Sequence, residues 1–481
     1  MKNVCFYFKI HQPYRLKRYR FFDIGNDHYY YDDFANDEII SRLAEVSYMP
    51  MCDTILEMIK ESKGGFKCSI SISGTALEQL QMYVPECVDK LKQLAETGSV
   101  EFLAGTYAHS LASLEDPEEF IREVKLENDL IYRTLGIKPK TFANTELIYD
   151  DDIAMLIYGM GFKTCLIPGA KHVLGWKSPN YVYSAATAPK LKLLLTNDKL
   201  SEDISRNFNN PDWPEYPLNA DKYMDWIAAL PEEQQLINLY FSMDTFGSFL
   251  TASTGIFEFM KALPRFAAER NIVFSTPSEV TSKLKPVDEL AIPYPVSDID
   301  EARDVSAWKG NSLQNEALGK LYGVAERVSL CDDRRLKQDW EYLQSSDHFY
   351  YMSTKNMADG ASHAAFSPYD SPFSAFTNYM NVLADFLVRV EEQYPESIDN
   401  EELNSLLLTI RNQADEINSL NKEVKTLRAN IINDDTIPVV AAEEVVVKEE
   451  PAKKLAAKKP AAKKTTAKKP AAKKAAAKKE D

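Results

Sequence analysis

The chain has 481 residues, of which 45% are hydrophobic and 27% charged, and its net charge is −16 at pH 7. This length allows two or three domains with large cores, and no apolar run approaches the length of a membrane span. The composition favours a globular protein and excludes an integral membrane protein.

The charge is unevenly distributed. Residues 451–481 carry 12 lysines against Glu480 and Asp481, a net charge of +10, which leaves −26 for the rest of the chain. An acidic body does not favour nucleic-acid binding through the folded part. The six cysteines form no close pair and lie mostly in apolar runs, as buried thiols do in a reducing compartment. The chain starts on a strand-like run without a signal peptide, so the expected location is the cytoplasm.

Strand-like and helix-like stretches alternate over residues 1–285, as expected of a parallel sheet in an α/β protein. A helical pattern at Pro117–Leu135 is one example. Seven or eight such units in one run favour a barrel over an open sheet. The expected strands are Val4–Ile10, Phe66–Ser73, Val100–Leu103, Thr141–Thr145, Thr164–Ile167, Leu191–Leu195, Ile237–Ser242 and Ile272–Ser275.

Prolines at 286, 293 and 295 indicate a boundary after this region. Residues 286–395 are helical in pattern and form a predicted second domain, with an aromatic loop at 346–352 inside it. Residues 400–432 carry apolar side chains at 3-4 spacing, which predicts a coiled coil through which copies of the chain could assemble. The alternative is a long helix docked on its own body.

The last segment, residues 436–481, is predicted to be disordered, because its Lys/Ala/Pro-rich part has almost no large apolar side chains to bury. Lysine pairs recur there every five residues and resemble the tails of linker histones. Contact with nucleic acid or another polyanion through 451–481 is one hypothesis, and a solubilising role is the other.

Glu146 is the first candidate for a catalytic residue. It follows the short apolar run that begins at Thr141 and precedes the helical pattern that starts at Ile153. Residues at the ends of barrel strands, before the next helix, often carry out chemistry or hold substrate. The alternative is a solvated loop acid beside the acidic run 150–152.

His11 and Gln12 end the first strand, because Pro13 stops it, and they are expected at its carboxyl end. The segments 11–13 and 144–149 are two of five motifs in the sequence. The other three lie at 254–259, 276–280 and 346–352. Together they make residues 1–395 resemble glycoside hydrolase family 57, and in particular its α-amylase-type branch.

The resemblance implies an incomplete (β/α)7 barrel, similar to a TIM barrel, and a helical domain that completes the cleft. It also implies action on α-glucans with retention of configuration. Glu146 matches the family's nucleophile, and His11 matches a substrate contact. Further substrate-binding positions are expected at Gln12, Trp308, Asp347 and His348. The alternative for residues 347 and 348 is a capped, hydrogen-bonded helix start. No cofactor is expected. The six histidines include no closely spaced pair, so no metal is expected either.

The chain departs from the family pattern at the proton donor. Ser242 stands at the acid/base position, and Asp244 replaces a glutamate two positions later. A retaining mechanism needs two carboxyl groups about 5–5.5 Å apart. Loss of a general acid typically costs about 10²–10⁴-fold in rate. Asp244 is a possible substitute, because side chains two apart on a strand point the same way.

Three functions therefore compete. The first is an α-glucan hydrolase or transferase, with weak activity if the acid is lost. The second is a catalytically impaired relative that binds glucan or acts as a scaffold. The third is a polyanion-associated protein that acts through its lysine-rich tail.

Overall fold

The computed structural model describes residues 1–355, 367–394, 413 and 419–420. Residues Met1–Glu396 form one compact unit, and Ser397–Asp481 form the second. The boundary predicted at 285/286 falls inside the first unit and stays a prediction. The predicted coiled coil at 400–432 lies outside the described residues, except for positions 413, 419 and 420. The predicted tail at 436–481 lies wholly outside them.

In the part of the chain that the structure describes, ten strands form two five-stranded sheets. One sheet has the order β3-β2-β1-β8, with β9 also paired to β1, and the other has the order β10-β6-β7-β5-β4. Every pair is parallel except β6 with β7. The strands are β1 (Lys2–Ile10), β2 (Cys68–Ile72), β3 (Val100–Leu103), β4 (Thr141–Ala143), β5 (Thr164–Ile167), β6 (Val182–Ala185), β7 (Lys192–Leu195), β8 (Leu236–Ser242), β9 (Ile272–Phe274) and β10 (Glu289–Leu290).

All eight expected strands are confirmed, and β6 and β10 were not expected. The α/β class is likewise confirmed, although the antiparallel pair makes one sheet mixed. Two isolated parallel bridges, Ala104 with Phe142 and Thr196 with Asn238, continue the pairing from one sheet to the other. The carboxyl ends of β1, β2, β3 and β4 therefore lie along one continuous edge.

Strand β1 is buried along its whole length, as expected of a strand covered on both faces. Phe6 and Phe8 belong to a cluster shared with Ile55 of α2 and Met260 of α11. Tyr7, which points to the opposite face, belongs to a smaller cluster with Leu166 and Leu194 of the other sheet. The residues of odd number on β1 therefore face the space between the two sheets.

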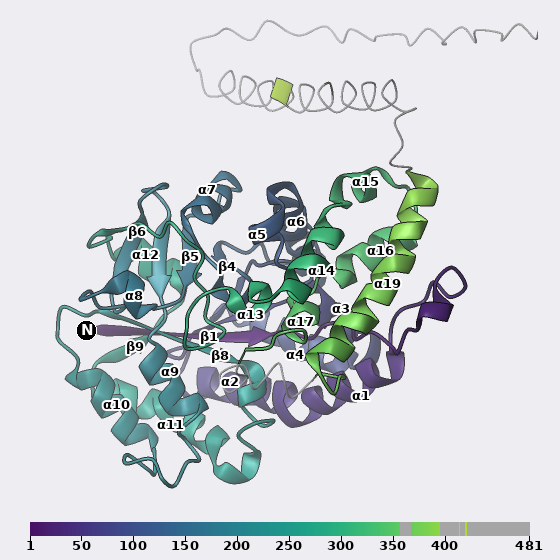
Figure 1. The fold of residues 1–481 in the computed structure, drawn as a ribbon. Helices are drawn as coiled ribbons and strands as arrows, with labels where there is room; N and C mark the ends of the chain where they lie inside the picture. Colours follow the sequence, from purple (N-terminus) through teal and green to yellow (C-terminus); the bar gives the residue numbers. More distant parts are fainter. Residues whose placement is uncertain (356–366, 395–412, 414–418, 421–481) are drawn as a thin grey trace, which may run out of the picture. The chain divides into compact units, whose positions relative to one another are not determined.

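Helices surround the strands (Figure 1). Those before residue 285 are α1 (Asp33–Leu43), α2 (Met49–Glu61), α3 (Gly74–Tyr83), α4 (Pro85–Glu96), α5 (Ala112–Glu115), α6 (Pro117–Leu135), α7 (Asp151–Gly159), α8 (Lys171–Leu174), α9 (Asp198–Ser205), α10 (Ala220–Ala229), α11 (Ile256–Glu269) and α12 (Pro277–Lys283). Helix α6 has the predicted bounds: Asp116 caps its first turn, Pro117 fits that turn, and Gly136 ends it with φ 72°.

The described part of the chain after residue 300 is helical, as predicted. It contains α13 (Ser306–Lys309), α14 (Ser312–Tyr322), α15 (Ala325–Leu330), α16 (Arg334–Leu343), α17 (Ser346–Tyr350) and α19 (Pro372–Gln393). The expected aromatic loop at 346–352 is wrong over residues 346–350, which form α17. Its five residues are all buried, and that packing explains why an aromatic segment is ordered there. None of the helices in the described ranges is long and apolar enough to cross a membrane.

Candidate active site

Lys9 and His11 lie at the carboxyl end of β1 and on the same side as Tyr7. Figure 1 shows β1 running from the N-terminus toward α17, and the ring of His11 reaches Asp347 of that helix. The end of β1 therefore brings together groups from the strands and from the helical region.

Glu146 lies in a single 3₁₀ turn, Thr145–Leu147, between β4 and α7. Its backbone is left-handed, with φ 42°, and Leu147 follows at φ 54°. Such conformations are costly for residues other than glycine and concentrate at functional sites. The turn holds the Glu146 carboxylate in a buried position, where Oε1 contacts the ammonium of Lys9 and lies 3.0 Å from His109 Nε2.

His109 is buried and has a left-handed backbone at φ 54°. Burial, together with the nearby ring of His11, lowers the pKa of His109 to about 3. Its imidazole is therefore neutral at pH 7, and Nε2 carries the proton that it donates to the Glu146 carboxylate. The ammonium of Lys9 and the neutral imidazole of His109 thus both stabilise the negative charge of Glu146.

The imidazole of His11 is fixed on three sides. Its Nδ1 lies 2.8 Å from Ser73 Oγ, just after β2, and its Nε2 lies 2.7 Å from Asp347 Oδ2 on α17. The ring stacks on the ring of His109 at a centroid distance of 4.1 Å. His11, His109 and Glu146 thus form one contiguous group, with the Asp347 carboxylate at its far end.

Ser242 ends β8 directly beside Lys9, with which it is in register. Tyr240, two residues earlier, therefore points to the same side. The negative charges of Glu146 and Asp298 both contribute to raising the pKa of Tyr240, although burial is the main cause. The face of β8 that carries Ser242 thus borders the Glu146 site.

Asp244 lies in the 3₁₀ turn Met243–Thr245 that follows β8, and it is 4% exposed. Its charge contributes to raising the pKa of Tyr48, a phenol that belongs to the cluster outside the sheet. Asp244 is thus a buried acid whose neighbours include Tyr48. The chain leaves the strand at Ser242, so the alternation that would place residues 242 and 244 on one face ends there.

Asp298 is an acid at the site that the sequence did not reveal. Its backbone N–H donates to the carbonyl of Glu146 at 2.8 Å, beside the antiparallel bridge between Tyr149 and Val296. Its side chain is 19% exposed, and Arg303 Nη1 lies 2.5 Å from Oδ1. Burial is the main cause that raises the pKa of Asp298 to about 7; the charges of Asp198 and, after it, Glu146 add to the rise, and Arg303 opposes it.

The other three predicted substrate-binding residues are buried. Gln12 accepts from Arg15 at 2.8 Å, and His348 Nε2 lies 3.2 Å from the carbonyl of Tyr342. Burial lowers the pKa of His348 to about 4, so the ring is neutral. Trp308 is 1% exposed and packs in the large cluster around the helical region. Contact between sugar and these three residues stays a prediction, which their packing does not favour.

The sequence held a signal for one of the missed residues and not for the others. Lys9 is the single charged residue in the apolar, buried run Val4–Ile10, and a buried charge requires a partner. His109 follows β3 by six residues, and Asp298 lies in an irregular segment after the expected domain boundary. No local pattern relates either of them to Glu146.

Comparison with known proteins gives consistent matches. The sequence model of glycosyl hydrolase family 57 matches residues 5–293. A protein of Methanocaldococcus jannaschii, named "Putative alpha-amylase", is 37% identical over 403 residues, which are 81% of this chain and 85% of that protein.

Solved structures agree at the level of the fold. The branching enzyme of Pyrococcus horikoshii matches with a TM-score of 0.60 at 12% identity, over 84% of this chain and 93% of that one. The 4-α-glucanotransferase of Thermococcus litoralis matches with a TM-score of 0.55 at 16% identity. That match covers 73% of this chain but only 56% of the longer transferase chain.

Proposed function

The chain belongs to glycosyl hydrolase family 57, and from this premise we propose that it is an α-glucan-active enzyme of the α-amylase type with Glu146 as its nucleophile. One observation carries the proposal. A buried carboxylate follows β4 at the sheet edge where β1 and β2 also end, and Lys9 and His109 contact it. In barrels of parallel strands, this is the end at which catalytic groups gather.

The strand pairing supports an incomplete seven-stranded barrel. Seven parallel strands neighbour one another in the order β8, β1, β2, β3, β4, β5 and β7. The two isolated bridges connect β3 with β4 and β7 with β8. The helical region reaches the same end through the contact of Asp347 with His11. That contact supports the proposal that the helical region completes the substrate cleft.

In the proposed retaining reaction, the carboxylate of Glu146 attacks the anomeric carbon as the glycosidic bond breaks, and water then releases the sugar. His109 stays neutral and donates to Glu146, which orients the attacking carboxylate. Lys9 also contacts Glu146 and stabilises its charge before attack. Because that stabilisation is weakened when the carboxylate bonds to carbon, Lys9 should slow the first step.

The leaving oxygen needs a proton, and Asp298 is the strongest candidate to supply it. Its backbone adjoins that of Glu146, its pKa is raised to about 7, and its side chain is partly exposed. A carboxyl that stays protonated near neutral pH suits general acid catalysis. Asp244 is less exposed and lies beside Tyr48, whereas the hydroxyl of Ser242 does not ionise near neutral pH.

The alternative is a catalytically impaired relative that binds α-glucan. Two observations favour it: a serine stands at the family's acid position, and the ammonium of Lys9 contacts the proposed nucleophile. Assembly through 400–432 and polyanion contact through 451–481 also stay predictions, since both segments lie outside the described residues apart from three positions.

The test measures hydrolysis of an α-1,4-glucan and of an aryl α-glucoside whose phenol leaving group needs little protonation. Glu146→Gln should abolish both reactions and leave glucan binding intact. Asp298→Asn should slow glucan hydrolysis more than aryl glucoside hydrolysis. A larger selective loss in Asp244→Asn would assign the proton to Asp244. Glucan binding without hydrolysis would support the impaired relative, and absence of glucan binding would refute both functions.

A further inference from the structure

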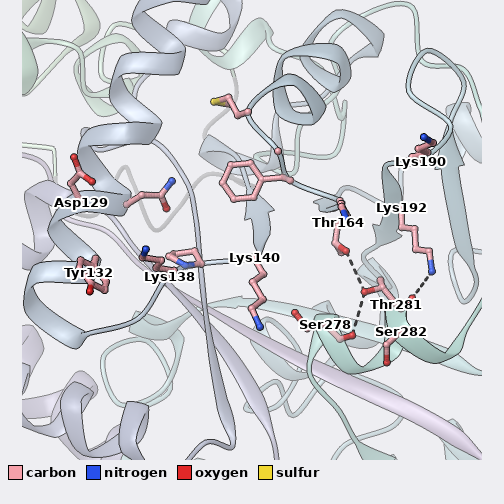
Figure 2. Close-up of a pocket in the computed structure, with 16 residues that line it drawn as sticks. Asp129, Tyr132, Lys138, Lys140, Thr164, Lys190, Lys192, Ser278, Thr281 and Ser282 are labelled. Atoms are coloured by element: carbon pink, nitrogen blue, oxygen red, sulfur yellow. Dashed lines mark hydrogen bonds between the residues drawn. The ribbon is translucent and has the colours of Figure 1, made fainter. Parts of the chain in front are cut away.

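Figure 2 shows a cavity of about 850 Å³, which lies at the amino ends of β4, β5 and β7. Its lining includes Thr164 and Lys192, the first residues of β5 and β7, and Lys140, which directly precedes β4. Glu146 follows the other end of β4. This cavity is therefore separate from the candidate active site, and a ligand there would not occupy the glucan site.

The cavity is unusually rich in lysine. Five lysines line it, against a single acidic residue, Asp129. Figure 2 shows Lys138 and Lys140 on the segment before β4, and Lys190 and Lys192 at the start of β7. The fifth, which the figure does not label, is Lys163.

These lysines have no carboxylate partner among the residues that the structure describes. Some lysines elsewhere in the described chain do pair with carboxylates, as Lys90 does with Asp53 and Lys320 with Glu316. Lys192 donates to the carbonyl oxygens of Thr281 and Leu284, and the ammonium of Lys138 lies 5.1 Å from the centroid of the Tyr132 ring. Like charges gathered around one hollow repel each other, and a bound anion would relieve that repulsion.

The cavity also presents hydrogen-bonding groups that are suited to hydroxyls. The side-chain oxygen of Asn128 is buried in the cavity lining and has no hydrogen-bond partner within the described ranges. Such an oxygen needs a donor. The hydroxyls of Ser278, Thr281 and Ser282 line the same cavity. Each already donates within the protein, to Glu101, Pro277 and Glu279 respectively, so toward a ligand each can act as an acceptor. A fitting ligand therefore carries negative charge for the lysines and hydroxyl donors for Asn128.

We propose that this cavity binds a phosphorylated sugar, with the phosphoryl group among the lysines and a sugar hydroxyl donating to Asn128. Phosphate oxygens accept from ammonium groups in strong, charge-assisted hydrogen bonds. The ribose phosphate of a nucleotide shares this chemistry, so the probes must separate the two sources.

The experiment is calorimetric titration of the full chain with glucose 1-phosphate, glucose 6-phosphate, ATP, inorganic phosphate and glucose, at low and high salt. A sugar phosphate should bind, more weakly as salt increases. Glucose alone should not bind. Tighter binding of ATP, in competition with the sugar phosphates, would assign the site to nucleotides. Binding of inorganic phosphate as tight as that of every sugar phosphate would refute the role of the sugar.

The variant Lys140→Gln/Lys190→Gln should weaken binding about tenfold or more, since hydrogen bonds to charged groups contribute at least that much. The matched control, Lys60→Gln/Lys171→Gln, removes two exposed lysines away from the cavity and should bind normally. Both variants keep the lysine-rich tail, so a difference between them reports the cavity alone. Equal binding by the two, or no binding by the parent at millimolar concentrations, would overturn the proposal.

Discussion

Replacement of Lys9 by methionine should destabilise the protein strongly. The side chains of Lys9 and Glu146 are 10% and 5% exposed, so the substitution leaves a buried carboxylate without its cation. Removing one partner of a buried ion pair typically costs about 3–5 kcal/mol, which is a large share of the total stability of a typical domain. His109 still donates one hydrogen bond to Glu146, so we expect the lower end of this range, about 3 kcal/mol.

The free energy of unfolding can be measured by urea denaturation, followed by tryptophan fluorescence. The double variant Lys9→Met/Glu146→Gln should recover much of the loss, because an amide needs no counter-charge, and the coupling should reach about 2 kcal/mol. The loss in Lys9→Met should also be smaller at pH 4 than at pH 8, because protonation can neutralise the unpaired carboxyl.

A matched control is Lys320→Met, which breaks an exposed pair whose side chains are 49% and 50% exposed. Exposed pairs contribute about 0–1 kcal/mol, so this variant should stay close to the parent. The reasoning fails if Lys9→Met costs no more than Lys320→Met, or if the coupling between Lys9 and Glu146 is near zero.

Two further predictions concern Asp298 and Gly247. If Asp298 is the proton donor, its raised pKa of about 7 means that the rate of glucan hydrolysis should decline as pH rises through 7. In Asp298→Asn, this decline on the alkaline side of the pH–rate profile should be absent. An unchanged pH–rate profile would contradict the assignment. Gly247 has φ 102°, and a Cβ there would lie 1.9 Å from the carbonyl oxygen of Val46. Gly247→Ala should therefore lower the unfolding free energy by about 2–5 kcal/mol, against about 1–2 kcal/mol for Gly136→Ala, where φ is 72° and the space is open. Equal losses would show that the clash is relieved by movement.

The strands were predictable because each of the eight expected is a short apolar run bounded by turn or helix signals. Strand β10 has only two residues and gives no such signal. Strand β6 lies between loops as a four-residue segment, and its antiparallel pairing with β7 breaks the strand–helix alternation on which the prediction relied.

Residues of the candidate site were predictable only where their position at the end of a strand indicates a functional role. His11 and Glu146 follow strand ends, and the structure brings their surroundings together through His109. The contacts that define the site join residues far apart in the chain, such as Lys9 with Glu146, separated by 137 positions. A local pattern carries no information on such a pair, and Asp298 was missed for the same reason.

The contact of His11 with Asp347 has a consequence for how this protein can evolve. Ser345 also bridges Ser110, and the N–H of Ser346 donates to the carbonyl of His109. The short helix α17 is therefore joined to the strand ends by both backbone and side-chain bonds. A helical region exchanged as a cassette between relatives would bring a new α17 against old strand ends, and any mismatch would displace the imidazole pair beside Glu146. Natural variation in the helical region should thus be concentrated away from α17, in helices such as α15 that do not touch this junction.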